Sequence, residues 1–243
     1  MSPQDEELAY LEAYDPNHFD RPSVAVDLVI LTVDEGGLQV LLAEREQLPL
    51  RGRLALPGGF VRVEEPLEVA AARLLAAKGS ITDVYLEQLY TFGAPGRDPR
   101  MRVISVAYVA LVAPERMPEG NDKRRAWDIE VPWAGEEGGP VIIRGPEGPV
   151  SLAFDHEEMI ALSVKRLRGK LAYTPIGYQF LGETFTLRAL QGVHEAILGR
   201  PLNKDSFRRR MLASGELTPT GLRESAVGHR PAELYRFTHR SAV

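Results

Sequence analysis

The 243-residue sequence contains no cysteine. This absence excludes disulfide bonds, thiolate zinc sites and a cysteine nucleophile, and it is compatible with a reducing cytoplasm. The chain also lacks any apolar run of the roughly 20 residues that a membrane span requires. Nothing in the first thirty residues looks like an export signal, because residues 1–20 are acidic and contain no apolar run. We therefore expect a cytoplasmic protein with no membrane partner.

Charge is distributed unevenly along a chain that is long enough for two ordinary domains. Residues 156–243 contain 14 Lys and Arg against 8 Asp and Glu, a net charge of +6. The preceding 155 residues contain 15 against 26, a net charge of −11. The asymmetry fits a C-terminal part that binds a polyanion, and it equally fits an ordinary solvated surface.

The first 154 residues follow the pattern of a mixed sheet with a few helices, which places this part in the α/β (α+β) class. Two apolar, β-branched runs predict a hairpin, and a later, wholly apolar run predicts a central strand. A stretch rich in Pro, Glu and Gly predicts a surface excursion anchored by Trp127 and Trp133. The predicted elements are strands at Ser23–Val33, Leu38–Ala43, Arg53–Leu56, Val103–Val112, Val141–Ile143 and Val150–Ala153, a tight turn at 34–37, a loop at 57–59, a helix at Pro66–Lys78 and the excursion at Pro114–Pro140.

From Asp155 onward the pattern changes to helices followed by a hairpin. Asp155 and Glu158 form an Asp-x-x-Glu capping box, which predicts a helix that continues to Gly169. Further helices are predicted at Thr186–Leu198 and after Asn203, and then strands at Glu216–Thr220 and Glu233–Phe237 around a loop at Gly221–Arg230. This is the element order of a winged helix-turn-helix, so residues 155–243 are predicted to form a linker helix and a winged-helix domain.

A helix that reads the major groove must donate to base edges and phosphates, and flanking elements supply further cations. The predicted DNA-binding residues are Lys204, Ser206, Arg208, Arg209 and Arg230. Arg223 and His229 lie in the same predicted wing as Arg230. The same pattern also fits a small helical dimerisation domain whose arginines are merely solvated.

The stretch GFVRVEEPLEVAAARLLAAKGSI at 59–81 resembles the Nudix hydrolase signature. Gly59, Glu65 and Arg73 keep its frame. The three glutamates that follow the Arg in that signature are replaced by Leu74, Ala77 and Lys78. Because Mg²⁺ and Mn²⁺ need oxygen ligands, this degenerate Nudix box predicts neither a catalytic residue nor a metal site.

A structural interpretation of the same segment needs no metal. Pro66 suits the first position of a helix, Lys78 and Gly79 suit its end, and Leu74 falls on the apolar side of the helix. The remaining alternative is that Glu64, Glu65 and Glu68 recruit a metal in an altered geometry.

Several longer stretches resemble the Nudix-related transcriptional regulators, typified by the repressor of NAD metabolism. They are GRDPRMRVISVAY at 96–108, FDHEEMIALSVKRLRGKLAYTPIGYQFL at 154–181, FTLRALQGVHEAILGRPLNKDSFRRRML at 185–212 and HRPAELYRF at 229–237. The resemblance implies a homodimer that binds a palindromic operator in double-stranded DNA and controls genes of NAD or sugar metabolism. It also implies a Nudix-like domain that senses a nucleotide-sugar effector such as ADP-ribose and needs no cofactor.

The resemblance makes Arg97, Arg100 and Arg102 candidates for holding a diphosphate, although all three also fit ordinary surface residues near the start of a strand. Two other functions stay open. One is a Nudix hydrolase acting on nucleoside diphosphate-linked substrates. The other is a protein-binding adaptor with no nucleic-acid partner.

Overall fold

The computed structural model describes residues 2–34, 37–121, 123–225, 228 and 230–238. Its main sheet has the strand order β5-β6-β1-β2-β7-β8-β9, with β3 paired to β2 and β4 paired to β1. The strands are β1 (Ser23–Asp34), β2 (Gly37–Glu44), β3 (Leu54–Ala55), β4 (Gly58–Phe60), β5 (Tyr85–Phe92), β6 (Val103–Leu111), β7 (Arg124–Glu130), β8 (Ile142–Gly145) and β9 (Gly148–Val150). β1 runs parallel to β6 and antiparallel to β2, so the sheet is mixed, as predicted.

Strand β1 shows why both faces of the sheet are covered. Val29, Leu31 and Val33 pack into one hydrophobic core, whereas Leu28 and Ile30 pack into another on the opposite face. Successive side chains of a strand point to opposite faces, so a continuous apolar run needs a partner on each side. The run at 103–111 is buried for the same reason, and the prediction of a central strand there is confirmed.

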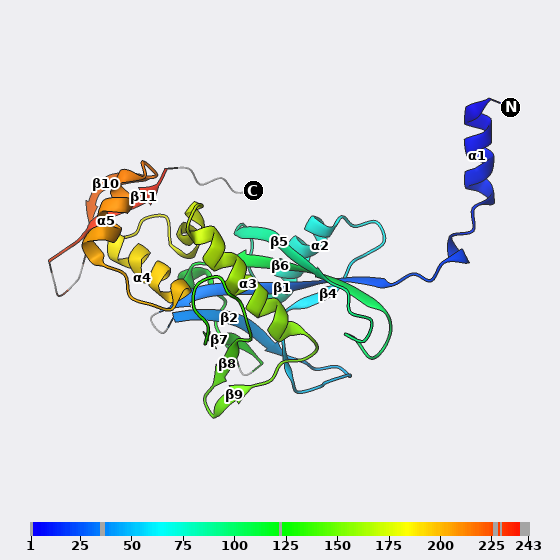
Figure 1. Ribbon diagram of the computed structural model, residues 1–243, viewed down its shortest axis with the longest axis horizontal. Helices are drawn as coiled ribbons and strands as arrows, with labels where there is room; N and C mark the ends of the chain where they lie inside the picture. The colour runs from blue at the N-terminus through cyan, green and yellow to red at the C-terminus, as the bar shows by residue number, and fades with distance from the viewer. Residues whose placement is uncertain (1, 35–36, 122, 226–227, 229, 239–243) are drawn as a thin grey trace.

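Helices supply those partners, as Figure 1 shows. α2 (Leu67–Leu74) covers the core that contains Leu28 and Ile30. α3 (His156–Leu171) and part of α4 (Leu187–Leu198) cover the core on the other face. The C-terminal helices therefore pack directly on the sheet.

The helix predicted at Pro66–Lys78 is real but differs at both ends. Pro66 is the N-cap rather than the first helical residue, and the last turn is a π-helix, η2 (Leu75–Gly79). Ser80, not Gly79, takes the left-handed conformation that ends the helix, at φ 58°. Leu74 is buried at 3% exposure, as predicted.

The capping box predicted at Asp155 and Glu158 is wrong, although α3 begins where it was expected. The Asp155 carboxylate makes no capping hydrogen bond. It accepts two hydrogen bonds from the Arg97 guanidinium instead, at 2.6 and 2.8 Å. A bidentate, charge-assisted pair of hydrogen bonds is stronger than one hydrogen bond from a backbone amide, so the Asp155 carboxylate binds Arg97 instead of capping the helix.

The C-terminal region forms a winged helix with its own small core. After the 3-10 helix η4 (Pro175–Phe180), the order is α4, α5 (Lys204–Ala213), β10 (Leu217–Arg223) and β11 (Glu233–Phe237). Thr186 and Asn203 cap the two helices through their side-chain oxygens. The cap at Asn203 was predicted, whereas the cap at Thr186 was not. Tyr178, Phe185, Leu190, Phe207 and Tyr235 lie at the centre of this core.

Some elements differ from the predictions because tertiary pairing forms them. The predicted loop at 57–59 is largely strand β4, and the predicted surface excursion contains β7, which pairs with β2. β10 extends to Arg223, into the predicted wing loop. β5, η4 and the N-terminal helix α1 (Pro3–Ala13) were not predicted. Residues 35–36 of the predicted tight turn lie outside the described residues.

Helix α1 is followed by the short 3-10 turn η1 (Pro16–His18) and extends away from the rest of the chain (Figure 1). A second such turn, η3 (Pro114–Arg116), follows β6. None of the helices in the described part of the chain is long and apolar enough to cross a membrane.

Candidate functional site

A pocket of about 720 Å³ opens where the start of α3 meets the sheet. Its walls come from β1, the segment from Ala43 to Gln47, the strand β4, the loop that carries Arg97, Asp98 and Arg100, the residues Asn121, Lys123 and Arg124, and the residues Phe154 and His156 at the start of α3. Small-molecule sites in proteins commonly have volumes of about 300–1,000 Å³. The pocket is therefore large enough for a ligand of nucleotide size.

Asp27 forms the centre of a buried polar network in this pocket. It interrupts the apolar run of β1 and is only 8% exposed. Ser105 on β6 donates a hydrogen bond to Asp27 Oδ2 at 2.6 Å, and an Arg97 nitrogen lies 3.4 Å from the same oxygen. A carboxylate buried in this way is stabilised by such partners.

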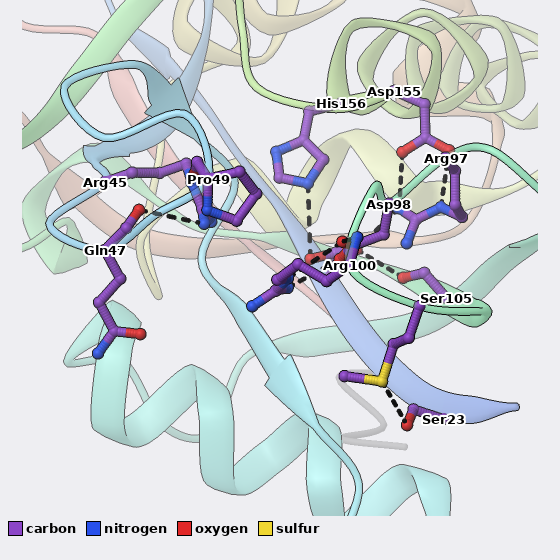
Figure 2. A network of polar contacts seen from close by, with 12 residues as sticks. Ser23, Arg45, Gln47, Pro49, Arg97, Asp98, Arg100, Ser105, Asp155 and His156 are labelled. Atoms are coloured by element: carbon purple, nitrogen blue, oxygen red, sulfur yellow. Dashed lines mark hydrogen bonds and ion pairs between the residues drawn. The ribbon is translucent and has the colours of Figure 1, made fainter.

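His156, the first residue of α3, closes the network from above (Figure 2). Its Nδ1 accepts a hydrogen bond from the Leu56 amide at 2.9 Å, and its Nε2 lies 3.7 Å from Asp27 Oδ1. Accepting at Nδ1 puts the ring proton on Nε2, on the side of Asp27. Burial lowers the pKa of His156 even though Asp27 opposes this effect, so the imidazole is neutral near pH 7.

The pair formed by Arg97 and Asp155 ties this pocket to α3. The side chains of Arg97 and Asp155 are 5% and 15% exposed, respectively, and their contacts are seen in Figure 2. Because Asp155 directly precedes the first residue of α3, this pair attaches the loop that carries Arg97 to the start of that helix.

The three arginines predicted to hold a ligand are distributed differently from one another. Arg97 and Arg100 line the pocket, and each is already paired with a carboxylate, Asp155 and Asp98 respectively. Arg102 is exposed, is not part of the pocket lining and donates to the Gly93 carbonyl oxygen at 2.7 Å.

The degenerate Nudix box serves as a structural clip in this chain. Arg73 donates to both carboxylate oxygens of Glu65, at 2.5 and 2.7 Å, and also to the Phe60 carbonyl oxygen at 3.3 Å. Hydrogen bonds from Arg73 lower the pKa of Glu65 to about 2. Gly59 lies in β4. A β carbon added at Gly59 would lie 2.9 Å from Leu74 Cδ2.

The residues present do not fit a divalent cation. Glu65 is engaged by Arg73, and the exposed side chains of Glu64 and Glu68 are not part of the pocket lining. Among the described residues, no group of three His, Cys, Asp or Glu side chains is arranged to hold a metal. Leu74 is buried and Ala77 has no ligand atom, while Lys78 lines the pocket as an ammonium.

Sequence reasoning missed Asp27, His156, Arg45 and Arg124, all of which line the pocket. One signal was available: Asp27 is an acid in the middle of the run SVAVDLVILTV, where an unpaired charge would be costly. Nothing in the sequence indicated that the other three would line the same pocket as Asp27.

The second candidate site is the exposed side of α5. Lys204, Ser206, Arg208 and Arg209 are exposed there, while Phe207 is 3% exposed and holds the helix on the winged-helix core. Arg230 is exposed ahead of β11, and Arg223 at the end of β10 donates to the Pro231 carbonyl oxygen at 3.2 Å. His229 lies outside the described residues.

Comparison with known proteins covers both sites. Residues 21–134 match the NUDIX domain family, and residues 177–237 match the NrtR DNA-binding winged helix domain. The chain is 37% identical over 233 residues to NtrR of Acinetobacter baylyi, an ADPR-responsive transcriptional repressor, covering 95% of this chain and 88% of that protein. The chain belongs to the NrtR family of Nudix-related transcriptional regulators.

Solved structures of another NrtR, from Shewanella oneidensis, are similar. Its complex with a 27mer DNA has a TM-score of 0.73 and 33% identity, covering 88% of this chain and 93% of that one. Its NUDIX domain in complex with ADP ribose has a TM-score of 0.51 and 31% identity, covering 66% of this chain and 98% of that one. The predicted fold, a Nudix-type mixed sheet followed by a winged helix, is confirmed for this NrtR-family chain.

Proposed function

We propose that this protein is a transcriptional regulator that binds a palindromic operator through its winged helix and senses ADP-ribose in the pocket beside α3. It acts as a homodimer, because a palindrome presents two equivalent half-sites. Its two modules correspond to residues 1–154 and 155–243, with α3 as the connection.

One observation carries the proposal for DNA binding. In a winged helix of NrtR type, the exposed side of α5 presents Lys204, Ser206, Arg208 and Arg209. A helix of this kind places its N-terminal part in the major groove, where arginine and lysine donate to guanine and to phosphates. Arg230, in the segment that leads into β11, contributes a contact to the phosphate backbone of the DNA.

The pocket supports the proposal for the effector. It combines a volume of about 720 Å³ with several arginines and lysines in its walls, and ADP-ribose carries a diphosphate between two sugars. Arg97 and Arg100 remain candidates for contacts with this ligand. Phe60 and Phe154 offer aromatic surface to its base.

We infer that the pocket binds this ligand without cleaving it. Hydrolysis of a diphosphate by a Nudix site relies on metal-bound carboxylates, and Leu74, Ala77 and Lys78 supply none. A sensor that does not hydrolyse its effector leaves the concentration of that effector unchanged.

DNA binding is tested by fluorescence anisotropy with a labelled palindromic duplex from upstream of a candidate operon, at several salt concentrations. We expect Arg208→Ala with Arg209→Ala to weaken binding and to reduce the slope of log K against log salt by about 2 per protomer. Arg51→Ala with Arg53→Ala, a pair of exposed arginines outside the winged helix, is the matched control. An unchanged affinity and slope in the α5 variant would remove this helix from the interface.

Hydrolysis is tested separately, by incubating the protein with ADP-ribose and Mg²⁺ or Mn²⁺ and measuring AMP. We expect no release of AMP above the protein-free rate. Turnover that disappears in Glu65→Gln would show an active hydrolase, the alternative function, in place of a silent sensor.

A further inference from the structure

The pocket holds cations that folding has not neutralised. Arg97, Arg100 and Lys123 are each ion-paired, with Asp155, Asp98 and Glu46. Arg45, Lys78 and Arg124 line the same pocket, and none of them lies within 4.0 Å of a carboxylate oxygen in the described part of the chain. Their charge is therefore available to an anionic ligand.

Lys78 is the best placed of these cations. It lies in the π-turn at the end of α2, and its Nζ donates to the Gly58 carbonyl oxygen on β4. A β carbon on Gly59 would stand 3.8 Å from Nζ, so the ammonium lies directly against the glycine edge of the pocket. An ammonium has three N–H donors, and the Gly58 carbonyl oxygen accepts a hydrogen bond from one of them. The other two can donate to an anionic ligand.

Arg124 fixes the turn that carries Lys78. Its guanidinium donates to the Lys78 carbonyl oxygen and to Ser80 Oγ, the latter at 3.2 Å. Its Nε is buried and has no hydrogen-bond partner within the described residues. Arg124 thus positions the lysine and brings a second positive charge to the same wall.

Arg45 provides a third charge from the neighbouring wall. Its guanidinium lies 4.7 Å from the centre of the Phe154 ring, and its Nε donates to the Pro49 carbonyl oxygen at 3.0 Å. Arginine stays protonated at any physiological pH, so this charge persists despite partial burial.

The same arrangement opposes a divalent cation. A Mg²⁺ ion beside Gly58 would face the ammonium of Lys78 and the guanidinium of Arg124, and like charges in a partly desolvated site repel strongly. The acids nearest in sequence do not offset this, because Glu65 is paired with Arg73.

We infer that Lys78, supported by Arg124 and Arg45, is a built-in cationic clamp that holds the diphosphate of the effector in place of a metal. Binding of ADP-ribose is therefore independent of divalent cations. This inference rests on the proposed function, since it specifies how the proposed effector pocket binds its ligand.

Isothermal titration calorimetry of the full chain with ADP-ribose tests the clamp. We expect the Kd in EDTA to agree with the Kd in Mg²⁺ within about twofold. Lys78→Met should weaken binding by about 10- to 100-fold, the equivalent of losing a charge-assisted hydrogen bond. Lys165→Met is the matched control, because Lys165 is an exposed lysine outside the pocket.

The outcomes separate the clamp from the proposed function. Binding that requires Mg²⁺, or a Lys78→Met variant that binds like the wild type, would overturn the clamp and leave an ADP-ribose sensor in place. A folded wild-type protein that does not bind ADP-ribose under either condition would overturn both. If Lys78→Met does not fold, Lys78→Gln and the comparison of EDTA with Mg²⁺ on the wild type still decide the matter.

Discussion

Gly58 occupies a position in the pocket wall where a side chain has no room. A β carbon there would lie 2.2 Å from Asp27 Oδ1 and 2.7 Å from the Val26 carbonyl oxygen. The close approach follows from the pairing of Gly58 with Asp27 between β4 and β1. Only glycine lets the strand that carries the Lys78 acceptor lie this close to the buried acid.

Gly58→Ala should therefore destabilise the protein by about 2 kcal/mol or more, because backbone and a buried carboxylate must move apart. It should also weaken binding of ADP-ribose. Urea unfolding and calorimetry measure the two effects. Gly96→Ala is the control, since a β carbon at Gly96 meets no atom within 4 Å. Equal stability of the two variants would contradict the close approach.

His194 gives the winged helix a defined pH dependence. It is 7% exposed and packs edge-on against Phe207, with ring centroids 5.0 Å apart. Burial, helped by the charge of Arg210, lowers the pKa of His194 to about 4 from its ordinary value of 6.5. The folded state thus binds this proton less readily than the unfolded state does.

Acidification therefore destabilises the folded protein through His194. Stability is complete above pH 6.5 and is lost as the pH falls toward 4, where the loss from His194 approaches about 3 kcal/mol. His156 acts in the same direction, because burial lowers its pKa too. Urea unfolding of His194→Leu at pH 7 and pH 5 isolates the His194 contribution. This variant should lose less stability on acidification than the wild type, and identical pH profiles would contradict the prediction.

At the scale of elements, sequence patterns predict best where one segment determines its own structure. The apolar runs of β1 and β6 and the Asn203 cap of α5 are local features, and they were predicted correctly. β7 has the sequence RRAWDIE, whose polarity resembles a loop, and it becomes a strand because β2 pairs with it. Pairing between distant segments overrides local propensity.

The candidate site shows the same limit at finer detail. Arg97, Arg100 and Arg102 are near neighbours in the sequence, yet two line the pocket and one does not. Arg97 meets Asp155 across 58 residues of chain, and Arg124 meets Lys78 across 46. The composition gives the number of charged residues, but which of them pair with one another depends on the fold. The composition of the site therefore depends on contacts between residues that are distant in the sequence.

The Arg97–Asp155 pair anchors the start of α3, and its removal should be costly. Asp155→Asn removes the charge that pairs with the Arg97 side chain, which is 5% exposed, and leaves Asp27 at 3.4 Å as its one carboxylate partner among the described residues. Breaking a buried ion pair from one side costs about 3 kcal/mol. Glu130→Gln is the control, because the pair of Glu130 with Arg144 has side chains that are 45% and 43% exposed and should contribute little. Equal melting temperatures for the two variants would show that Arg97 does not anchor α3.

At the scale of the whole molecule, α3 connects the pocket to the winged helix. Its first residues, Asp155 and His156, belong to the pocket network. Near its other end, the buried Arg168 donates to the Ile197 carbonyl oxygen on α4 at 2.8 Å and to the Trp133 carbonyl oxygen at 2.7 Å. α3 and α4 also share one core with the sheet, so we expect a shift at the pocket end to reach the helices that carry α5.

We expect this connection to couple the proposed binding of ADP-ribose to the binding of DNA, and thermodynamic linkage makes any such coupling reciprocal. If saturating ADP-ribose changes the Kd for the operator duplex by some factor, saturating duplex must change the Kd for ADP-ribose by the same factor. Coupling free energies between two sites are typically about 1–3 kcal/mol, which corresponds to a factor of about 5 to 150. Anisotropy measures the first factor, and calorimetry with and without duplex measures the second.

Asp155→Asn then tests whether α3 carries the coupling. A ligand shifts an equilibrium only through its differential affinity for two states, and we expect the Arg97–Asp155 pair to be a contact through which the pocket acts on the helix. The variant should still bind duplex DNA and ADP-ribose separately, with the two coupling factors reduced toward one. Since α5 is distant in sequence from the substitution, the salt slope of DNA binding should stay at the wild-type value. A variant that keeps the full coupling factor would place the transmission elsewhere, in the sheet that α4 also contacts.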